Sequence, residues 1–395
     1  MHEENLVLLP GPTPVPERVK QAVNGSMINH RGDEFADLLF HVTESIKRMF
    51  KTQNEVLTVT SSGTGAMEAA VSNFISPGDQ VVVAVAGGFG ERFYKLACAF
   101  GAHPIRIEAP LGQAIEPNKI EKILATDTKQ EIKAIFVTHN ETTTGVYNDL
   151  EAISKARGNH PALLIVDSIS GLGAMDVRTD EWDLDVVLTG SQKSFMMPPG
   201  LAMLSISPRA WEVAQNCSNS HFYFDLKNIK DFYGKGQVPF TPALSLYYGL
   251  EEALKMIEEE GRENIVNRHK LLRQMVRESM HALGLRLFAH EEVASPSLTT
   301  VMVPSYMDSS KLVERIKEYN VLFAGGQGEL KGKIFRFGHL GYVKPMDIIT
   351  AISALEMTLN ELNYQVELGK GVRTAQEILL ENRKQHAMKS QREIS

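Results

Sequence analysis

The stretch ALLIVDSISGLGA, residues 162–174, contains a nearly continuous apolar run that ends in an acid. Such a run is typical of a strand that is buried on both faces of a parallel sheet. Asp167 would then lie at the C-terminal end of a strand, where open α/β sheets bind their ligands. A single acid at this position is also a common helix cap, so the stretch indicates a sheet more firmly than a site.

The same pattern continues along the first half of the chain. Further apolar runs typical of buried strands cover residues 56–60, 80–85, 103–107, 134–138, 186–189 and 202–206. Helical patterns separate several of these runs, at residues 64–74, 90–100, 117–125 and 150–157. Alternating strands and helices predict an α/β domain with a mostly parallel central sheet.

The pattern changes near residue 240. Two long amphipathic helices are predicted over residues 244–260 and 262–283. Strands near 299–303 and 334–337, with helices near 309–319 and 345–362, then predict a smaller C-terminal α+β domain. We expect an N-terminal segment (1–20), a large domain (21–260), a small domain (261–368) and a polar tail (369–395).

Composition and charge narrow the class of protein. Hydrophobic residues make up 43% and charged residues 23%, which excludes a disordered or fibrous chain. The net charge of 41 − 48 = −7 gives no basic excess for nucleic-acid binding. The apolar runs are far shorter than the roughly 20 residues that span a bilayer, and the N-terminus lacks a signal-peptide pattern. Two cysteines, Cys98 and Cys217, do not form the disulfide framework of a secreted protein. Taken together, these observations predict a cytoplasmic protein with no membrane or nucleic-acid partner and no metal site.

A glycine-containing loop follows the first predicted strand and begins a helix. It reads SSGTGAMEA over residues 61–69. Gly63 lets the backbone approach a ligand, the helix N-terminus presents free N–H groups to an anion, and Ser62 and Thr64 add hydroxyl donors. The loop matches neither the Walker A nor the dinucleotide-binding pattern. It fits one phosphate about as well as it fits an ordinary capped turn.

A lysine follows a later strand. Lys193 stands in GSQKS, residues 190–194, just before a Pro-Pro-Gly turn. A solvated loop position is the usual one for lysine, but a partly buried lysine has a lowered pKa and can bond covalently to an aldehyde. Phosphate loop, acid and lysine occur here in the order of a pyridoxal-phosphate site, which needs a phosphate cradle, a carboxylate on the pyridine nitrogen and a lysine on the aldehyde.

Nearly the whole chain resembles the class V aminotransferases of fold type I, in the alanine–glyoxylate and serine–pyruvate (serine–glyoxylate) group. The resemblance extends from PGPTP at residues 10–14 to RFGHLG at 336–341. Between them, SSGTGAMEAA, HNETTTG (139–145), VDSISGLGA (166–174) and SQK (191–193) match the family. It implies a homodimer with pyridoxal 5'-phosphate as cofactor, and an amino acid and a 2-oxo acid as substrates.

The resemblance also implies a role for individual residues. Lys193 would be the covalent cofactor lysine and Asp167 the partner of the pyridine nitrogen. The phosphate would be held by Ser62, Gly63, Thr64 and Gln192, with Gln237 and Thr241 contributed by the neighbouring subunit. Phe89 stands where the family stacks an aromatic ring on the cofactor, which is tryptophan or tyrosine in many members, and Thr142 where a hydroxyl residue contacts the cofactor ring or its 3′ oxygen. Arg336 would bind the substrate α-carboxylate, and the N-terminal segment would line the pocket at Gly11.

Each of these positions also has an ordinary structural explanation. Phe89 could be a core aromatic, Thr142 a turn cap, and Arg336 a solvent-facing residue on a strand. His30 and Arg31 resemble a pair that binds the substrate phosphate in phosphoserine aminotransferases, but the pair also occurs in members that do not use phosphoserine.

Three kinds of function remain after this reading. The first is transfer of an amino group from serine or alanine to glyoxylate or pyruvate in a ping-pong cycle. The second is another reaction on the same fold, such as phosphoserine transamination or a lyase reaction; a cysteine desulfurase is disfavoured because the loop at residues 323–330 contains no cysteine. The third is a non-enzymatic interaction protein, which an intact lysine, acid and phosphate loop make the least favoured.

Overall fold

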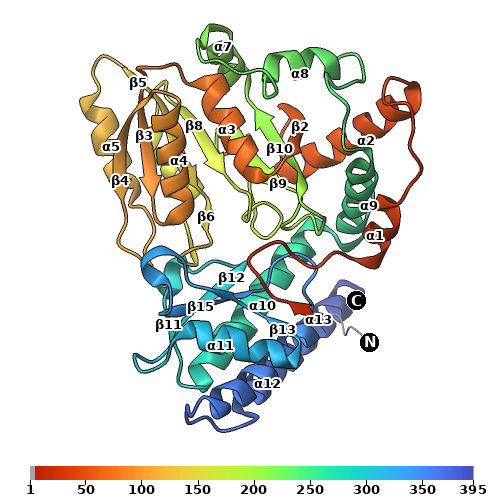
Figure 1. The fold of residues 1–395 in the computed structure, drawn as a ribbon, viewed down its shortest axis with the longest axis vertical. Helices are drawn as coiled ribbons and strands as arrows, with labels where there is room; N and C mark the ends of the chain where they lie inside the picture. Colours follow the sequence, from red (N-terminus) through yellow and green to blue (C-terminus); the bar gives the residue numbers. More distant parts are fainter. Residues whose placement is uncertain (1–4, 395) are drawn as a thin grey trace.

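The computed structural model describes residues 5–394, and a mostly parallel sheet lies at the centre of its larger part, the upper one in Figure 1. Its seven strands run in the order β2-β10-β9-β8-β5-β3-β4. All neighbours are parallel except β10, which is antiparallel to β2 and β9. The strands are β2 (Glu55–Ser61), β3 (Gln80–Val85), β4 (His103–Glu108), β5 (Ile132–Thr138), β8 (Leu163–Asp167), β9 (Val186–Gly190) and β10 (Gly200–Ile206). The predicted fold class is confirmed.

Helices cover both faces of this sheet. In β3, Val82 and Ala84 join one apolar cluster, whereas Val81 and Val83 join another, because successive side chains of a strand point to opposite faces. The first cluster includes side chains of α1 (Glu17–Val23), α2 (Asp33–Phe50), α5 (Pro117–Thr126), α6 (Leu150–Arg157) and α9 (Leu244–Glu260). The second includes side chains of α3 (Gly63–Phe74), α4 (Gly88–Ala99), α7 (Pro208–Asn216) and α8 (Leu226–Tyr233).

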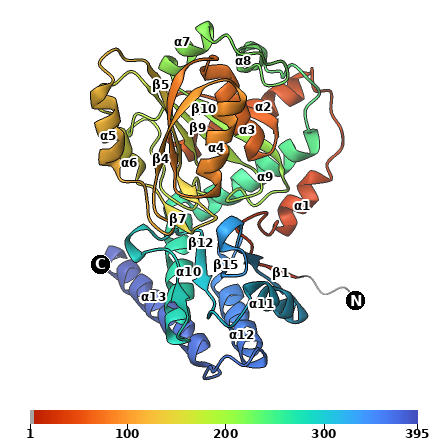
Figure 2. The same cartoon turned by 60° about the vertical axis from the view of Figure 1, so that its left-hand side comes forward.

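The C-terminal part has its own sheet and core (Figure 2). Its sheet is antiparallel, in the order β11-β12-β15-β14, and long helices pack against it. The strands are β11 (Arg286–Leu287), β12 (Leu298–Met302), β14 (Ala324–Gly325) and β15 (Ile334–Gly338). The helices are α10 (Arg262–Ala282), α11 (Ser309–Arg315), α12 (Pro345–Glu361) and α13 (Lys370–Ile394), with short 3₁₀ turns η1 (Glu291–Val293), η2 (Ile316–Tyr319) and η3 (Gly328–Leu330).

The N-terminal lead-in joins this smaller core. Its strand β1 (Leu6–Val7) pairs in parallel with β13 (Val321–Leu322). The Gly338 N–H donates to the Leu8 carbonyl at 2.8 Å, which attaches the lead-in to β15 as well. Leu8 belongs to the core of the C-terminal part and Val19, in α1, to a core of the large sheet, so the chain passes from one to the other within its first helix. Residues 1–4 of the expected N-terminal segment, and residue 395 of the tail, lie outside the described residues.

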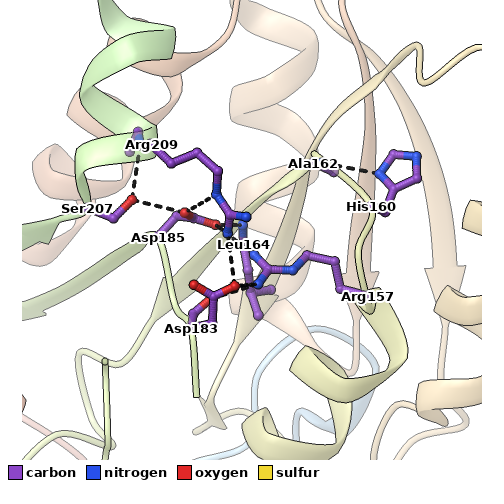
Figure 3. Close-up of polar contacts among 9 residues, drawn as sticks. Arg157, His160, Ala162, Leu164, Asp183, Asp185, Ser207 and Arg209 are labelled. Atoms are coloured by element: carbon purple, nitrogen blue, oxygen red, sulfur yellow. Dashed lines mark hydrogen bonds and ion pairs between the residues drawn. The ribbon is translucent and has the colours of Figure 1, made fainter. Parts of the chain in front are cut away.

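A cluster of ion pairs and hydrogen bonds around Asp185 lies at the N-terminal ends of β8 and β9 (Figure 3). Buried Asp185 accepts hydrogen bonds from Arg157 Nη1 (2.8 Å), Arg209 Nε (2.8 Å) and the Leu164 N–H (2.8 Å). Ser207, the N-cap of α7, donates to the same carboxylate at 2.9 Å. Breaking a buried pair of this kind costs about 3–5 kcal/mol. The cluster joins α6, β8, β9 and α7 at the edge of the sheet opposite to the predicted site.

Candidate active site

The predicted site residues gather at the C-terminal edge of the central sheet. Asp167 is the last residue of β8, and the register pairs it with Thr138 at the end of β5 and Leu188 in β9. Lys193 follows β9, and Phe89 lies in the first turn of α4, after β3. Since parallel strands end at one edge, segments that are far apart in the sequence meet there.

The start of α3 fits a phosphate. Its N-cap, Ser62, makes no side-chain cap hydrogen bond, so the first N–H groups of the helix remain available to an anion. A side chain at Gly63 would bring its Cβ to 2.5 Å from Ile169 Cδ1, so this helix start packs directly against the segment after Asp167. The Gln192 amide lies near the same backbone, and its NH₂ group is the kind of hydrogen-bond donor that a phosphate accepts. Thr64 is half-buried in the first turn of the same helix.

The N-terminal segment closes over the lysine. Lys193 Nζ donates to the Pro10 carbonyl at 2.7 Å, and Thr13 Oγ1 donates to the Lys193 carbonyl at 2.8 Å. Gly11 has φ +130°, and a Cβ there would lie 2.3 Å from Lys193 Nζ. Only glycine leaves room for the amine at this position. Gly11 therefore lies against Lys193.

Burial gives the acid and the amine of the site unusual pKa values. Desolvation raises the pKa of Asp167 to about 7, and the negative charge of Glu141 acts in the same direction. Desolvation lowers the pKa of Lys193 to about 8. A buried carboxylate is stabilised by a cation, which the protonated ring nitrogen of a bound pyridine would provide. The amine is partly deprotonated near neutral pH, as covalent bonding to an aldehyde requires.

Arg336 presents part of its guanidinium to the same space. It lies on β15 with 7% of its surface exposed. Its Nε donates to the Gly325 carbonyl at 2.9 Å and its Nη1 to the Thr142 carbonyl at 3.2 Å. Arginine has five N–H donors, so these two bonds leave a fork for a carboxylate. The same contact places Thr142 beside Arg336.

Arg92 is a cation of the site that the sequence reading missed. Its Nη1 donates to Thr64 Oγ1 at 2.7 Å, and its Cζ lies 4.6 Å from the centre of the Phe89 ring. Its charge also acts on Asp167 and Lys193. Arg92 thus joins the phosphate loop to the aromatic residue expected over the cofactor. Its position one helical turn after Phe89 on α4 was a signal that could have indicated it.

Glu141 was missed as well. This fully buried carboxylate accepts hydrogen bonds from the N–H groups of Phe89 (2.9 Å) and Gly90 (3.1 Å) at the start of α4. It also accepts from the N–H and the hydroxyl of Thr143, at 3.1 and 2.6 Å. Burial raises its pKa, and these hydrogen bonds oppose the rise. Glu141 therefore fixes the Phe89 turn against the segment that carries Thr142.

Two predicted residues lie elsewhere. Gln237 contacts Arg31, and its amide oxygen accepts from Arg31 Nη1 at 3.2 Å. Thr241 is exposed and lines a small cavity with Tyr223 and Tyr247. Neither residue joins the group around Lys193 within this chain. That position is compatible with the expected role at a neighbouring subunit, which stays a prediction.

Comparisons with known proteins agree on one family. A family model described as "Aminotransferase class-V" matches residues 15–330. A "Soluble hydrogenase, small subunit" of a Synechococcus species is 44% identical over 382 residues, which cover 96% of this chain and 99% of the relative. An L-aspartate–glyoxylate aminotransferase of Paracoccus denitrificans is 38% identical over 382 residues (95% and 96% covered). A serine–glyoxylate aminotransferase of Methylorubrum extorquens is 36% identical over 388 residues (96% of both chains).

The structure is also similar to solved ones. The alanine–glyoxylate aminotransferase of a Nostoc species superposes with a TM-score of 0.87 at 32% identity, covering 91% of this chain and 96% of the other.

Within residues 5–394, no helix is both long and apolar enough to cross a membrane. The same residues contain no group of three or more His, Cys, Asp or Glu side chains arranged to hold a metal ion.

Proposed function

The chain belongs to the class V aminotransferase family, whose cofactor is pyridoxal phosphate, and on that premise we propose the reaction that it catalyses. A small amino acid, serine or alanine, donates its amino group, and glyoxylate or pyruvate accepts it in a second half-reaction of a ping-pong cycle. The observation that carries the proposal is that Lys193 lies close enough to both Asp167 and Arg336 for their charges to act on it, while burial lowers the pKa of its amine to about 8.

Each of the three groups has a distinct task. Arg336 binds the α-carboxylate that every amino acid and 2-oxo acid substrate carries, and so orients the α-carbon. Bound pyridoxal phosphate supplies the electron sink that makes the α-hydrogen acidic. Asp167 keeps a positive charge on the ring nitrogen favourable. Lys193, with its pKa lowered to about 8, can take the α-proton and return it from the same position.

The cofactor's other contacts follow from the same residues. Ser62, Gly63, Thr64 and Gln192 would hold the phosphate at the start of α3. Phe89 would lie along the ring, with its turn fixed by Glu141. The lead-in at Pro10 and Gly11 covers the lysine from the small-domain side and helps to exclude water.

The names of the relatives support glyoxylate as the acceptor. Serine–glyoxylate, aspartate–glyoxylate and alanine–glyoxylate aminotransferases share the acceptor and differ in the donor. The donor is therefore the property that has to be measured. Aspartate is a further candidate donor, because one relative is an aspartate–glyoxylate aminotransferase. The name soluble hydrogenase belongs to another relative, and the lysine, acid and arginine described above favour amino transfer for this chain.

Phosphoserine is a less favoured donor. In the phosphoserine hypothesis, Arg31 would bind the substrate phosphate. In the structure its guanidinium donates to Gln237 Oε1 (3.2 Å) and to the carbonyls of Val238 (2.6 Å) and Pro239 (3.0 Å). A phosphate would have to replace these contacts. A lyase reaction would use the same lysine, acid and arginine, so only product analysis separates it from transamination.

We further propose a homodimer whose two active sites are each completed by the other subunit. Two large side chains beside the segment 236–242 are exposed, Phe222 (80%) and Tyr223 (44%). The Phe240 ring packs on Phe222 and Tyr223 at centroid distances of 5.7 and 5.1 Å. Exposed apolar groups of this size usually mark a surface that another protein covers. A second copy covering this surface would bring Gln237 and Thr241 to its own phosphate site.

A half-reaction screen tests the proposed function. Each candidate donor—serine, alanine, aspartate or phosphoserine—is mixed with the cofactor-loaded protein, and the spectral change from the aldehyde to the amine form of the cofactor is followed. We expect serine or alanine to convert the cofactor, and glyoxylate or pyruvate to restore it. Release of ammonia in place of a recoverable amine form would identify a lyase. No conversion by any donor would refute amino transfer, and Lys193→Ala is the matched negative control.

A further inference from the structure

Arg31 lies in a turn that fixes its direction. Its N–H donates to Asn29 Oδ1 at 3.0 Å, and the Gly32 N–H donates to the Asn29 carbonyl at 2.9 Å. Helix α2 begins directly afterwards at Asp33. The Arg31 side chain leaves this turn toward α8, where its Cζ lies 5.4 Å from the centre of the Phe232 ring.

The guanidinium then holds the irregular segment that joins α8 to α9. It donates to three successive residues of this segment, at Gln237 Oε1, the Val238 carbonyl and the Pro239 carbonyl. The segment is attached at its other side too, because the Gln237 N–H donates to the Phe232 carbonyl at 3.0 Å. The segment has no helix or strand of its own, and these contacts hold it together with the burial of Val238 in the large core.

Arg31 also fixes which way the Gln237 amide faces. A guanidinium can only donate hydrogen bonds, so the amide group must turn its oxygen toward Arg31. The NH₂ group of the amide donates to the Arg31 carbonyl at 3.5 Å, so Arg31 holds both ends of the amide and one N–H of the NH₂ group is left for a further acceptor. An NH₂ group is a hydrogen-bond donor, which is what a phosphate oxygen needs from its partner.

We propose that Arg31 is a positioning residue for the active site of a second copy of this chain. It holds Gln237 in the orientation that donates to the cofactor phosphate of the neighbouring subunit, and it keeps the chain toward Thr241 in place. The inference rests on the proposed shared-site dimer. It gives the HRG motif at residues 30–32 a function other than substrate binding, and it makes Arg31 act in trans.

Cofactor affinity in the homodimer gives the first test. Apo protein is titrated with pyridoxal phosphate, and the absorbance of lysine-bound cofactor is measured. Arg31→Gln should weaken binding roughly tenfold, as expected for loss of a charge-assisted contact network. Arg31→Lys should recover part of the loss, since lysine keeps the charge without the fork. Arg315→Gln, an exposed arginine of α11 that pairs with Glu318, is the control and should bind like wild type.

Hybrid dimers give the decisive test, because Lys193→Ala removes the lysine-bound signal from one chain only. An Arg31→Gln chain and a Lys193→Ala chain carry different affinity tags, and the hybrid is isolated by using both. The only lysine-bound signal of this hybrid comes from Lys193 of the Arg31→Gln chain. The active site around that lysine is completed by the 236–242 segment of the Lys193→Ala chain, in which Arg31 is intact. Binding should return to wild-type affinity. In the reciprocal hybrid, wild type with an Arg31→Gln, Lys193→Ala double variant, binding should stay weak.

The opposite pattern would overturn the inference. If Arg31 acts only within its own chain, the first hybrid stays weak and the reciprocal hybrid binds like wild type. Equal affinity of the Arg31→Gln and wild-type homodimers would overturn it as well. Failure of the wild-type protein to form any lysine-bound signal would refute the proposed function itself, so the two failures are distinguishable.

Discussion

Arg336→Gln tests how the site recognises both of its substrates. In the structure Arg336 uses two of its five N–H donors on backbone carbonyls, at Gly325 and Thr142, so three N–H donors are left for a carboxylate. Glutamine removes the charge and the fork while keeping a polar side chain. Since the amino donor and the 2-oxo acid both carry an α-carboxylate, the substitution should weaken both half-reactions by a similar factor.

The size of the effect follows from the contacts. A hydrogen bond to a charged group contributes roughly 1.5–3 kcal/mol, and a desolvated bidentate pair lies at the upper end of that range. A loss of about 3 kcal/mol corresponds to a decrease of roughly 150-fold in kcat/KM. Arg336→Lys keeps the charge but not the fork, so we expect a decrease of about 10-fold to 30-fold.

Single-turnover kinetics of each half-reaction provide the assay. The rate of cofactor conversion is measured against donor concentration, and the rate of its reversal against acceptor concentration. Arg315→Gln is the matched control and should behave like wild type. A KM that is unchanged for both substrates, or that rises for only one of them, would refute the assignment of Arg336 to the shared carboxylate.

Three further predictions concern the acid and the lysine. Asp167→Asn should lower kcat far more than it raises KM, because a neutral amide no longer stabilises the positive charge on the cofactor's ring nitrogen. Steady-state kinetics measure both constants, and a kcat within a few-fold of wild type would contradict the prediction. The pKa of Asp167 is raised from 3.8 to about 7 in the folded protein, so the stability of the cofactor-free protein should fall as pH rises through about 7. Melting temperatures at about pH 5 and about pH 7.5 should show a fall that is smaller in Asp167→Asn; an equal fall in both proteins would exclude Asp167 as its source. Lys193→Ala should abolish amino transfer, but the variant should still bind the cofactor through its phosphate, which equilibrium dialysis can measure. Near-wild-type turnover without added amine would refute the assignment of Lys193 as the cofactor lysine.

The large sheet was predictable because its strands are buried on both faces. The expected strand at residues 80–85 is β3 to the residue, and the helix at 244–260 is α9 with the same bounds. Apolar runs and long amphipathic periods carry this information without any help from distant contacts. The expected helix at 309–319 was wrong in its second half, where the chain tightens into the 3₁₀ turn η2.

Elements defined by partners far away in the sequence were not predictable. The two-residue strand β1 exists only because β13 lies beside it, and a sequence offers no periodicity over two residues. Helices α7 and α8 were missed because they are short and flanked by polar loops. In the site, Arg92 and Glu141 gain their meaning from contacts to Thr64 and Phe89, so motif matching did not select them.

The most direct test of the central claim is to locate the cofactor on the chain. Protein purified with pyridoxal phosphate is treated with borohydride, which makes the bond between cofactor and lysine permanent, and the peptides are analysed by mass spectrometry. Our account predicts the added cofactor mass on Lys193, with the cofactor absorbance bleached in parallel. Cofactor on a different lysine, or on none, would contradict it.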